Sequence, residues 1–285
     1  MKNLLLIIAT IFMMGSASSL SAKEFVFTAI PDQDDSRLQE RFGKVAAYLE
    51  KELGVKVKYI PVKSYSASVA AFKNDEVQLA WFGGLSGVKA RLAVPGSQAI
   101  ALGEEDTQFI SFVIANTSTG LSYSTEFPEG IEGKTFTFGS KGSTSGRLMP
   151  EYYIRSHFGK APEDVFKRVG FSGDHNKTIS LVQSGSYEVG VLNYKVWERE
   201  GGNIDPKKVN VIWQTPSYPD YNWSIRGDVD KNFGKGFTMK VKKALLAIKD
   251  RDILDTFPRK SFIEADNEMF KPVLDTAVEV GIIRR

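Results

Sequence analysis

The strongest constraint on the fold is an alternation of strand-like and helix-like segments that begins at Glu24. Residues 25–30 form a compact apolar run, and residues 34–53 carry apolar side chains at helical spacing until Gly54 ends the segment. Such alternation is typical of a mostly parallel sheet covered by helices. We therefore expect an α/β fold whose first βα unit lies in this region.

The same alternation continues in two further blocks. The first block predicts strands at 55–61, 77–82 and 109–115, and helices at 66–74 and 86–92. The second block predicts strands at 135–138, 166–171, 189–192 and 209–214, and helices ending near 158 and spanning 176–184. Each block is large enough to build a lobe with its own core.

A change of composition separates the two blocks. Residues 116–133 are rich in Ser, Thr and Gly, so we place a lobe boundary near Asn116, and a Pro-containing segment at 215–223 returns the chain to the first lobe. Helix-like segments at 237–249 and 268–280 are expected to pack back on that lobe. The predicted organisation is a signal peptide at 1–22, lobe 1 at 23–115 plus 224–285, and lobe 2 at 116–223. Two crossings between two lobes make a hinged cleft.

The N-terminus has the layout of a secretory signal peptide. Lys2 supplies a positive charge, residues 4–14 are almost wholly apolar and residues 15–22 are mostly small. The apolar run is too short for a membrane span, which takes about 20 residues, and a buried N-terminal helix is the less favoured interpretation. We expect cleavage after Ser21 or Ala22 and a mature protein that is soluble and periplasmic.

Composition excludes several kinds of site and partner. The 285 residues include no cysteine, which removes disulfides, thiolate metal sites and cysteine nucleophiles. His157 and His175 are the only histidines, so a histidine-rich metal site is excluded too. The 37 basic and 34 acidic residues leave a formal charge of +3, without the basic surface of a nucleic-acid binder. We expect no metal, no cofactor and no nucleic-acid partner.

The sharpest local feature is the turn at 139–146, between a predicted strand and a predicted helix. Ser143, Thr144 and Ser145 would place hydroxyls and backbone N–H groups at the N-terminus of that helix, which favours an anion. An ordinary Ser/Thr cap is the alternative interpretation. Pro150 leaves the start of the helix open, since a start at Ser143 puts the proline inside the helix and a start nearer Pro150 does not.

This turn matches neither of two catalytic motifs. A P-loop requires G-x-x-x-x-G-K-[ST], whereas Gly146 is followed here by Arg147 and Leu148. A nucleophile elbow has serine at the centre of G-x-S-x-G, and Thr144 occupies that centre. Nucleotide hydrolysis is not supported, and serine hydrolase chemistry would need one of the two histidines as its base.

Five further residues lie where loops would face a cleft. His175 opens a predicted helix and could donate to an oxyanion, or be an exposed residue near a cap. Tyr65, Trp81 and Phe82 lie at strand-to-helix turns, where open α/β sheets bind ligands. A surface position for Tyr65 and core packing for Trp81 and Phe82 are the alternatives. Asp220, on the return crossing, is either an acceptor for a ligand proton or a plain turn residue.

Taken in order, these segments resemble the periplasmic phosphonate-binding proteins of ABC importers, part of the type II solute-binding family. The resemblance covers nearly all of the mature chain and rests on residues 65, 77–83, 143–146, 173–175 and 219–220. It implies a two-lobe type II periplasmic binding protein fold with a hinged cleft. The chain is most similar to a subgroup labelled selenate-binding.

The resemblance also implies which residues surround the ligand. By position they are Tyr65, Ser143, Thr144, Ser145, His175 and Asp220, with Trp81 and Phe82 as candidate pocket walls. It implies a small tetrahedral oxyanion as ligand, an ABC permease in the inner membrane as partner, and binding rather than catalysis. We expect the protein to act as a monomer.

One departure from the family concerns specificity. Phosphonate binders usually carry a second tyrosine in the strand that here spans 108–112, and this strand has none. Asp220 favours phosphonate or phosphite, because a protonated ligand can donate to a carboxylate that would repel fully ionised sulfate or selenate. A sulfate- or selenate-type receptor, a serine-dependent hydrolase and the ligand-sensing part of a signalling system remain as alternatives.

Overall fold

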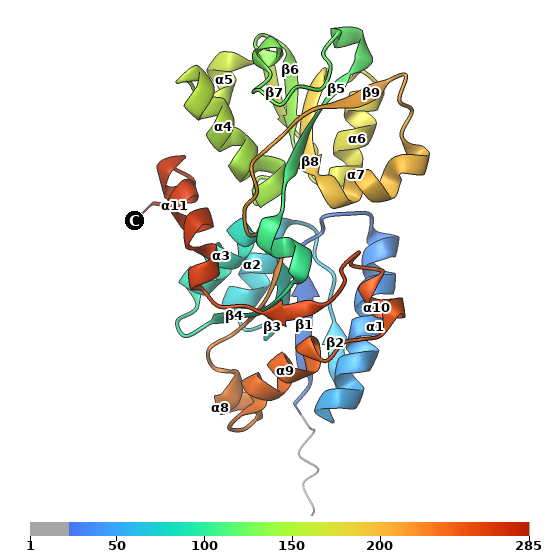
Figure 1. Ribbon diagram of the computed structural model, residues 1–285. Helices are drawn as coiled ribbons and strands as arrows, with labels where there is room; N and C mark the ends of the chain where they lie inside the picture. The colour runs from blue at the N-terminus through green and yellow to red at the C-terminus, as the bar shows by residue number, and fades with distance from the viewer. Residues whose placement is uncertain (1–22, 285) are drawn as a thin grey trace, which may run out of the picture.

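The computed structural model describes residues 23–284, so the predicted signal peptide at 1–22 lies outside the described residues. These residues form two α/β lobes, one above the other in Figure 1, and each lobe has its own sheet. The two-lobe α/β fold expected from the sequence is confirmed. Between residues 23 and 284 no helix combines the length and the hydropathy that a membrane span requires.

The first lobe is built on a six-stranded sheet in the order β11-β4-β10-β3-β1-β2. Its strands are β1 (Phe25–Ala29), β2 (Val57–Tyr59), β3 (Leu79–Phe82), β4 (Gln98–Gly103), β10 (Asn222–Ile225) and β11 (Phe262–Glu264). β1 pairs in parallel with β2 and β3, as successive βα units require, whereas β10 lies antiparallel between β3 and β4. The chain therefore returns to the middle of this sheet after building the second lobe.

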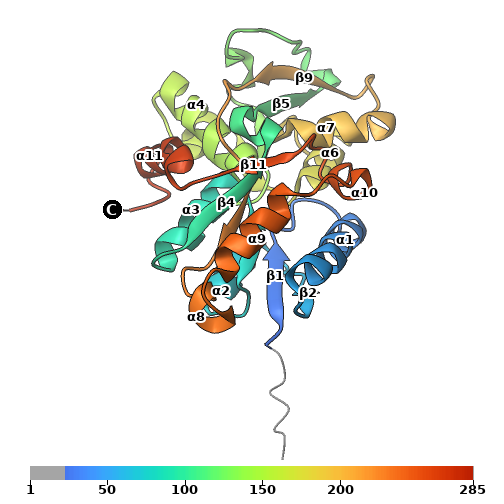
Figure 2. The same ribbon diagram turned by 60° about the horizontal axis from the view of Figure 1, so that its bottom comes forward.

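Helices cover both faces of the first sheet. They are α1 (Asp35–Leu53), α2 (Tyr65–Lys73), α3 (Gly84–Ala93), α8 (Val229–Phe233), α9 (Phe237–Leu246), α10 (Arg251–Leu254) and α11 (Lys271–Glu279). Helix α1 begins after Asp34, whose side chain accepts a hydrogen bond from the Arg37 N–H, and ends at Gly54 with a φ of 67°. Helix α9 packs against α1, β4 and β11 (Figure 2).

The second lobe contains a five-stranded sheet in the order β7-β6-β8-β5-β9. Its strands are β5 (Ser111–Asn116), β6 (Thr135–Phe138), β7 (Arg168–Phe171), β8 (Val189–Asn193) and β9 (Val209–Gln214). Its helices are α4 (Met149–Phe158), α5 (Pro162–Val165), α6 (His175–Gln183) and α7 (Tyr194–Glu200). The short turns of the molecule are η1 (Glu104–Gln108), η2 (Thr117–Thr119), η3 (Glu129–Ile131), η4 (Thr144–Leu148), η5 (Gly201–Asn203) and η6 (Glu268–Phe270).

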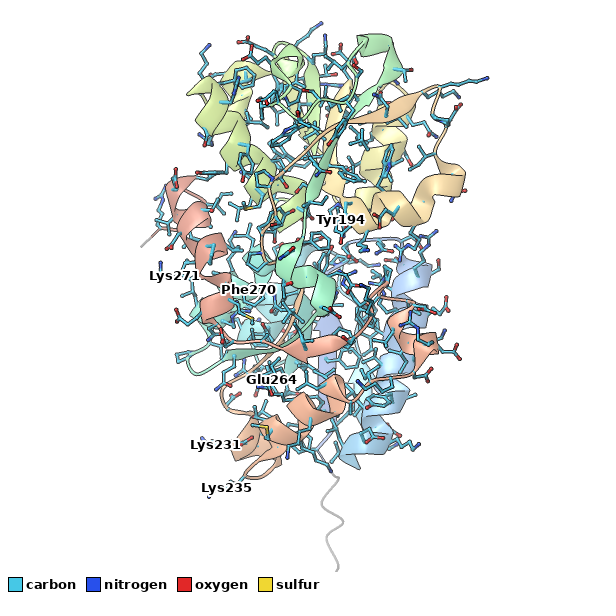
Figure 3. The ribbon with its side chains drawn as sticks, viewed as in Figure 1. Tyr194, Lys231, Lys235, Glu264, Phe270 and Lys271 are labelled. Atoms are coloured by element: carbon cyan, nitrogen blue, oxygen red, sulfur yellow. The ribbon has the colours of Figure 1, made fainter. Side chains whose placement is uncertain are left out.

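Two segments, residues 104–110 and 215–221, connect the lobes and pair with each other. Phe109 and Tyr218 exchange two backbone hydrogen bonds of 2.8 and 2.9 Å. Tyr194, at the start of α7, packs edge-on against Phe109 with ring centroids 4.9 Å apart, at the junction of the lobes (Figure 3). The crossings therefore form a short ribbon at the hinge between the lobes.

The first crossing lies earlier in the chain than the predicted boundary near Asn116. The strand that the sequence analysis assigns to the end of lobe 1 is β5, and it pairs with β8 and β9 in the second sheet. Residues 116–133 form a largely exposed connection between β5 and β6 within the second lobe. Their Ser-, Thr- and Gly-rich composition marks a long surface loop, whereas the crossing at 104–110 has no such composition.

Candidate functional site

Four helices begin where the two lobes face each other. They are α2 at Tyr65, α3 at Gly84, the turn η4 at Thr144 and α6 at His175. Each follows a strand, so these residues lie at the edge of the sheets where α/β proteins bind ligands. A helix N-terminus carries free N–H groups and a partial positive charge. The arrangement therefore favours a small anion.

The turn at 139–146 is closed at its base by two hydrogen bonds. The Gly139 N–H donates to the Gly146 carbonyl at 2.7 Å, and the Ser143 hydroxyl oxygen accepts from the Gly146 N–H at 2.9 Å. Ser143 is thus a helix cap, as one of the two sequence interpretations has it. The Ser143 hydroxyl also lies near the Tyr65 side chain of the first lobe, so the cap is close to a second candidate residue.

The start of the helix after this turn combines the two positions that the sequence left open. Helical geometry begins at Thr144 with a wide π turn, in which the Met149 N–H donates to the Thr144 carbonyl. The regular helix α4 then starts at Met149, so Pro150 falls in its first turn, where no N–H partner is needed. Single π turns of this kind occur frequently at functional sites.

Thr144 and Asp220 are both held by the N-terminus of α3. The Gly84 N–H donates to Asp220 Oδ1 at 2.8 Å, and the Leu85 N–H donates to Thr144 Oγ1 at 3.0 Å. The Thr144 hydroxyl also lies near the Asp220 carboxyl group and acts to lower its pKa. A Cβ atom at Gly83 would lie 3.2 Å from Asp220 Oδ1, so only glycine leaves this approach free. These bonds join the second lobe directly to the first.

Asp220 keeps one carboxyl oxygen without a partner. The residue is 1% exposed, and among the described residues its Oδ2 has no hydrogen-bond partner. Burial raises the pKa of Asp220 to about 7, although the Gly84 N–H and the nearby Thr144 hydroxyl act in the opposite direction. Near neutral pH this group can therefore accept a proton from a ligand or donate one to it.

His175 presents one ring nitrogen as an unused donor. Its Nδ1 accepts a hydrogen bond from the Asn193 N–H at 3.3 Å, which places the proton of the neutral ring on Nε2. Nε2 is buried and has no partner within residues 23–284. Burial lowers the pKa of His175, while Asp32 and Asp174 act in the opposite direction. A neutral His175 can offer an Nε2–H to an oxyanion.

Ser145 contacts a tyrosine that sequence reasoning did not single out. The Tyr218 hydroxyl shares a hydrogen bond of 2.5 Å with Ser111 Oγ and lies close to Ser145, and all three side chains are buried. Tyr218 comes from the return crossing and lies opposite Phe109 in the hinge ribbon. A buried tyrosine hydroxyl is thus present beside the strand that lacks the family's second tyrosine.

The two candidate wall residues lie on neighbouring positions of β3 and pack differently. Trp81 stacks on Tyr221, with ring centroids 5.5 Å apart and an interplanar angle of 21°. Phe82 packs edge-on against Phe72 of α2 at 5.6 Å, inside the core of the first lobe. Successive side chains of a strand point to opposite faces, which explains why the two aromatics have different surroundings.

Three residues beside the site escaped the sequence analysis. The Tyr221 hydroxyl donates to Asp32 Oδ2 at 2.9 Å, Asn193 Nδ2 donates to the Tyr221 hydroxyl at 2.9 Å, and the His175 N–H donates to the Asp32 carbonyl at 3.2 Å. Asp32 follows β1 and Asn193 ends β8, so the rule about strand ends could have found both. Tyr221 is next to Asp220 but carries no motif of its own.

The structure thus brings the six predicted ligand-binding residues together, with contributions from both lobes. None of the six is more than 2% exposed: Tyr65, Ser143, Thr144, Ser145, His175 and Asp220. Hydroxyls, a neutral imidazole and one carboxyl of raised pKa make a set suited to a compact oxyanion that carries a proton. Residues 23–284 contain no cluster of His, Asp and Glu that could hold a metal ion.

Comparison with known proteins agrees with this chemistry. The family model described as "ABC transporter, phosphonate, periplasmic substrate-binding protein" matches residues 27–270. A relative from Prochlorococcus marinus, named as a probable ABC transporter phosphite binding protein, PhnD1, is 40% identical over 266 residues. That alignment covers 90% of this chain and 89% of the relative.

Solved structures are similar as well. The crystal structure of PhnD1 in complex with methylphosphonate has a TM-score of 0.86, and the match covers 92% of this chain and 99% of that one. A binding-protein component of a phosphonate transporter from Pseudomonas aeruginosa, 19% identical, has a TM-score of 0.79 over 91% of this chain and 87% of the other, and shows the same fold. The chain therefore belongs to the family of periplasmic substrate-binding proteins of phosphonate ABC transporters.

Proposed function

We propose that this protein captures a small phosphonate or phosphite in singly protonated form and delivers it to an ABC permease. The observation that carries the proposal is the pair of buried, unpartnered polar atoms at the site, Asp220 Oδ2 and His175 Nε2. The ligand hydroxyl would donate to Asp220, and an ionised ligand oxygen would accept from His175. The relative PhnD1, named as a probable phosphite binding protein and solved in complex with methylphosphonate, points to the same ligand class.

Neutral hydroxyl groups would donate the remaining hydrogen bonds to the ligand. The hydroxyls of Tyr65, Ser143, Thr144 and Ser145 lie beside the N-termini of α2 and η4. Hydrogen bonds to a charged acceptor are worth about 1.5–3 kcal/mol each, roughly twice those between neutral groups. Sulfate and selenate present no proton at neutral pH, so Asp220 would repel them and favour the protonated ligands.

Binding rather than turnover is the function that the histidine geometry supports. A hydrolase would use His175 as a base toward a serine hydroxyl. The Asn193 N–H occupies Nδ1, however, so Nε2 carries a proton and acts as a donor. We therefore expect no release of product from a phosphoester or ester, and no activity that Ser145→Ala removes.

Calorimetric titration of the exported protein at pH 7.5 tests the ligand class. We expect methylphosphonate and phosphite to bind at least tenfold more tightly than sulfate or selenate, with phosphate as a further comparison. Tighter binding of sulfate or selenate would contradict the proposal. Incubation with p-nitrophenyl phosphate and p-nitrophenyl acetate tests the hydrolase alternative, and sustained release of nitrophenol that Ser145→Ala abolishes would favour it.

The transport partner and the location of the protein follow from the family. Its members are periplasmic substrate-binding proteins of ABC importers, so we infer a periplasmic location and a permease in the inner membrane for this chain. In cells that depend on phosphite as their phosphorus source, deletion of the gene should abolish growth. Normal growth of the deletion strain would contradict this role.

A further inference from the structure

A small cavity adjoins the candidate site and is bounded by both lobes. Asp32, Tyr221 and Asn193, which lie beside His175 and Tyr65, also line this cavity, together with Arg41 of α1 and Arg199 of α7. The cavity has a volume of about 10 Å³. That is room for one water molecule or one small ion.

Unpartnered polar atoms concentrate around this cavity. Of the twelve buried side-chain atoms without a hydrogen-bond partner among the described residues, six belong to residues that line it. They are Asp32 Oδ1, Gln33 Oε1, Arg41 Nε, Trp81 Nε1, Arg199 Nε and Arg199 Nη2. Four of the six are N–H donors, so the residues that line the cavity have more free donors than free acceptors. A buried donor without an acceptor costs free energy.

Two guanidinium groups at the cavity, those of Arg41 and Arg199, form no ion pair within the described part of the chain. Arg41 is 3% exposed, and within residues 23–284 it forms neither a salt bridge nor a hydrogen bond, its guanidinium resting 5.0 Å from the Phe257 ring centroid. Arg199 likewise has neither kind of partner in this part of the chain. Burial lowers the pKa of Arg41 to about 10, so the group stays charged at neutral pH.

The charges around the cavity do not balance. Asp32 supplies one negative charge against the positive charges of Arg41 and Arg199. The other two cations that line the cavity are already paired, Arg259 with Asp106 at 2.6 Å and Lys195 with Glu198 at 3.4 Å. Among the residues that line the cavity and their ion-pair partners, one positive charge is therefore left over. Asp34 and Glu200, which also act on Arg199, share the Arg37 guanidinium outside the cavity. A water molecule would satisfy donors, but only an anion would also offset this charge.

We propose that the cavity binds one small monovalent anion of about the size of chloride. The N–H groups of Arg41, Arg199 and Trp81 would hold it across the boundary between the lobes. A surface groove shares Arg41 and Arg199 with the cavity, so these two side chains lie between the cavity and the surface groove. This site lies outside the proposed oxyanion site and takes a different class of ligand.

The position of the anion couples it to closure of the lobes. Arg41 belongs to the first lobe and Arg199 to the second, so the ion gains its full set of donors only when the lobes are together. The oxyanion site is also assembled from both lobes. Each ligand should therefore favour the conformation that the other one needs, which is positive coupling between two sites.

Crystals grown in sodium bromide test the site directly. Anomalous diffraction at the bromine edge should show a peak in the cavity, within hydrogen-bond distance of Arg41 and Arg199. The peak should be absent in Arg199→Met. An ordered water without anomalous signal in the wild-type cavity would overturn the proposal, and this result does not depend on whether a phosphonate binds.

Titration with methylphosphonate in sodium chloride and in sodium gluconate, at equal ionic strength, tests the coupling. We expect affinity to fall at least fivefold in gluconate for the wild type, a typical size for coupling between sites, and to be independent of the salt in Arg199→Met. The control Arg168→Met removes an exposed arginine that donates to the Ser186 carbonyl and lines neither the cavity nor the groove, and it should behave as the wild type. Equal wild-type affinity in both salts would overturn the coupling. Failure of methylphosphonate to bind in any salt would instead count against the proposed function, and the bromide experiment would still decide the anion site.

Discussion

Among single residues, Asp220 links the pH of the medium to the choice of ligand. With a pKa of about 7, it is mainly a carboxylate at pH 8 and mainly a protonated carboxyl at pH 6. Sulfate and selenate stay fully ionised across this range, so any change in their affinity reports on the protein. A carboxylate repels these dianions, whereas a protonated carboxyl can donate a hydrogen bond to them.

We therefore predict that sulfate binds the wild type more tightly as the pH falls from 8 to 6. In Asp220→Asn, sulfate should bind at least tenfold more tightly than in the wild type at pH 8, and its affinity should no longer depend on pH. Calorimetric titration at both pH values measures this. Asp164→Asn, an exposed carboxylate of the second lobe, is the matched control. A sulfate affinity that Asp220→Asn leaves unchanged would remove the argument for selection by protonation.

The second residue with a free polar atom is His175. We predict that His175→Phe weakens methylphosphonate binding by roughly 10- to 100-fold, because it removes a hydrogen bond to a charged acceptor worth about 1.5–3 kcal/mol. The control is His157→Phe, since His157 stacks on Phe127 at the surface of the second lobe. Fluorescence or calorimetric titration measures both variants. Equal affinities would show that Nε2 of His175 does not face the ligand.

At the level of elements, the turn between β6 and α4 depends on a glycine. A Cβ atom at Gly146 would lie 3.0 Å from Ser143 Oγ and 3.2 Å from both His175 Cε1 and Gly139 Cα. We predict that Gly146→Ala pushes the hydroxyl turn away from His175 and weakens methylphosphonate binding at least tenfold. The affinity of the folded variant, checked by circular dichroism, tests this.

A glycine in open space provides the control for that substitution. Gly43 lies in α1, and a Cβ atom there would meet nothing within 4 Å. Gly43→Ala should leave binding unchanged and raise the free energy of unfolding by about 0.5–1 kcal/mol, because alanine favours the helix. If Gly146→Ala bound the ligand as tightly as Gly43→Ala does, the turn would not be part of the site.

Local patterns were enough to predict most of the elements. The apolar run at 25–30 and the helical spacing at 34–53 correspond to β1 (Phe25–Ala29) and α1 (Asp35–Leu53) almost residue for residue. These signals are strong because a buried strand and an amphipathic helix each repeat one rule over many residues. Strand β11 has three residues at the edge of its sheet, which is too short for any such repetition, and the sequence analysis missed it.

The same limit applies to the site. Tyr65, the hydroxyl turn and His175 could be placed at strand-to-helix turns, because that position depends only on local order in the chain. Their meeting depends on how the lobes close, which is set by long-range contacts such as the bond from the Leu85 N–H to Thr144. The interaction of Tyr218 with Ser145 has the same origin. Neither could be read from spacing along the sequence.

For the whole molecule, one buried ion pair fixes the hinge to the first lobe. Arg259 donates to both carboxyl oxygens of Asp106, at 2.8 and 2.6 Å, and the Asp220 N–H donates to the Asp106 carbonyl at 3.0 Å. Asp106 lies in η1 on the first crossing, and both partners are nearly inaccessible to solvent. The pair therefore anchors the two crossings to the C-terminal part of the first lobe.

We predict that Arg259→Met lowers the free energy of unfolding by about 3–5 kcal/mol, because it leaves the Asp106 carboxylate buried without a partner. Burial already raises the pKa of Asp106, and loss of Arg259 would raise it further. A raised carboxyl pKa favours the folded state at low pH and loses that effect as the pH rises. The deficit should therefore be larger at pH 8 than at pH 5.

Urea denaturation at the two pH values measures this effect. Arg251→Met, which removes an exposed arginine close to Arg259 in the sequence, should change the free energy of unfolding by less than about 1 kcal/mol. An equal deficit for the two variants, or a deficit at pH 5 that matches the one at pH 8, would show that the Asp106 pair does not carry this stability.

The pairing of Phe109 with Tyr218 in the hinge has a practical consequence. Because the two connections are joined to each other, the lobes can rotate about one axis but cannot easily slide past one another. A single distance between the lobes therefore describes how far they have closed. The chain has no cysteine of its own, and Tyr123 and Met239 are about half exposed on opposite lobes. Cysteines introduced at these two positions would accept a pair of dyes without competition, and energy transfer between the dyes would turn the protein into an optical sensor of its own solute.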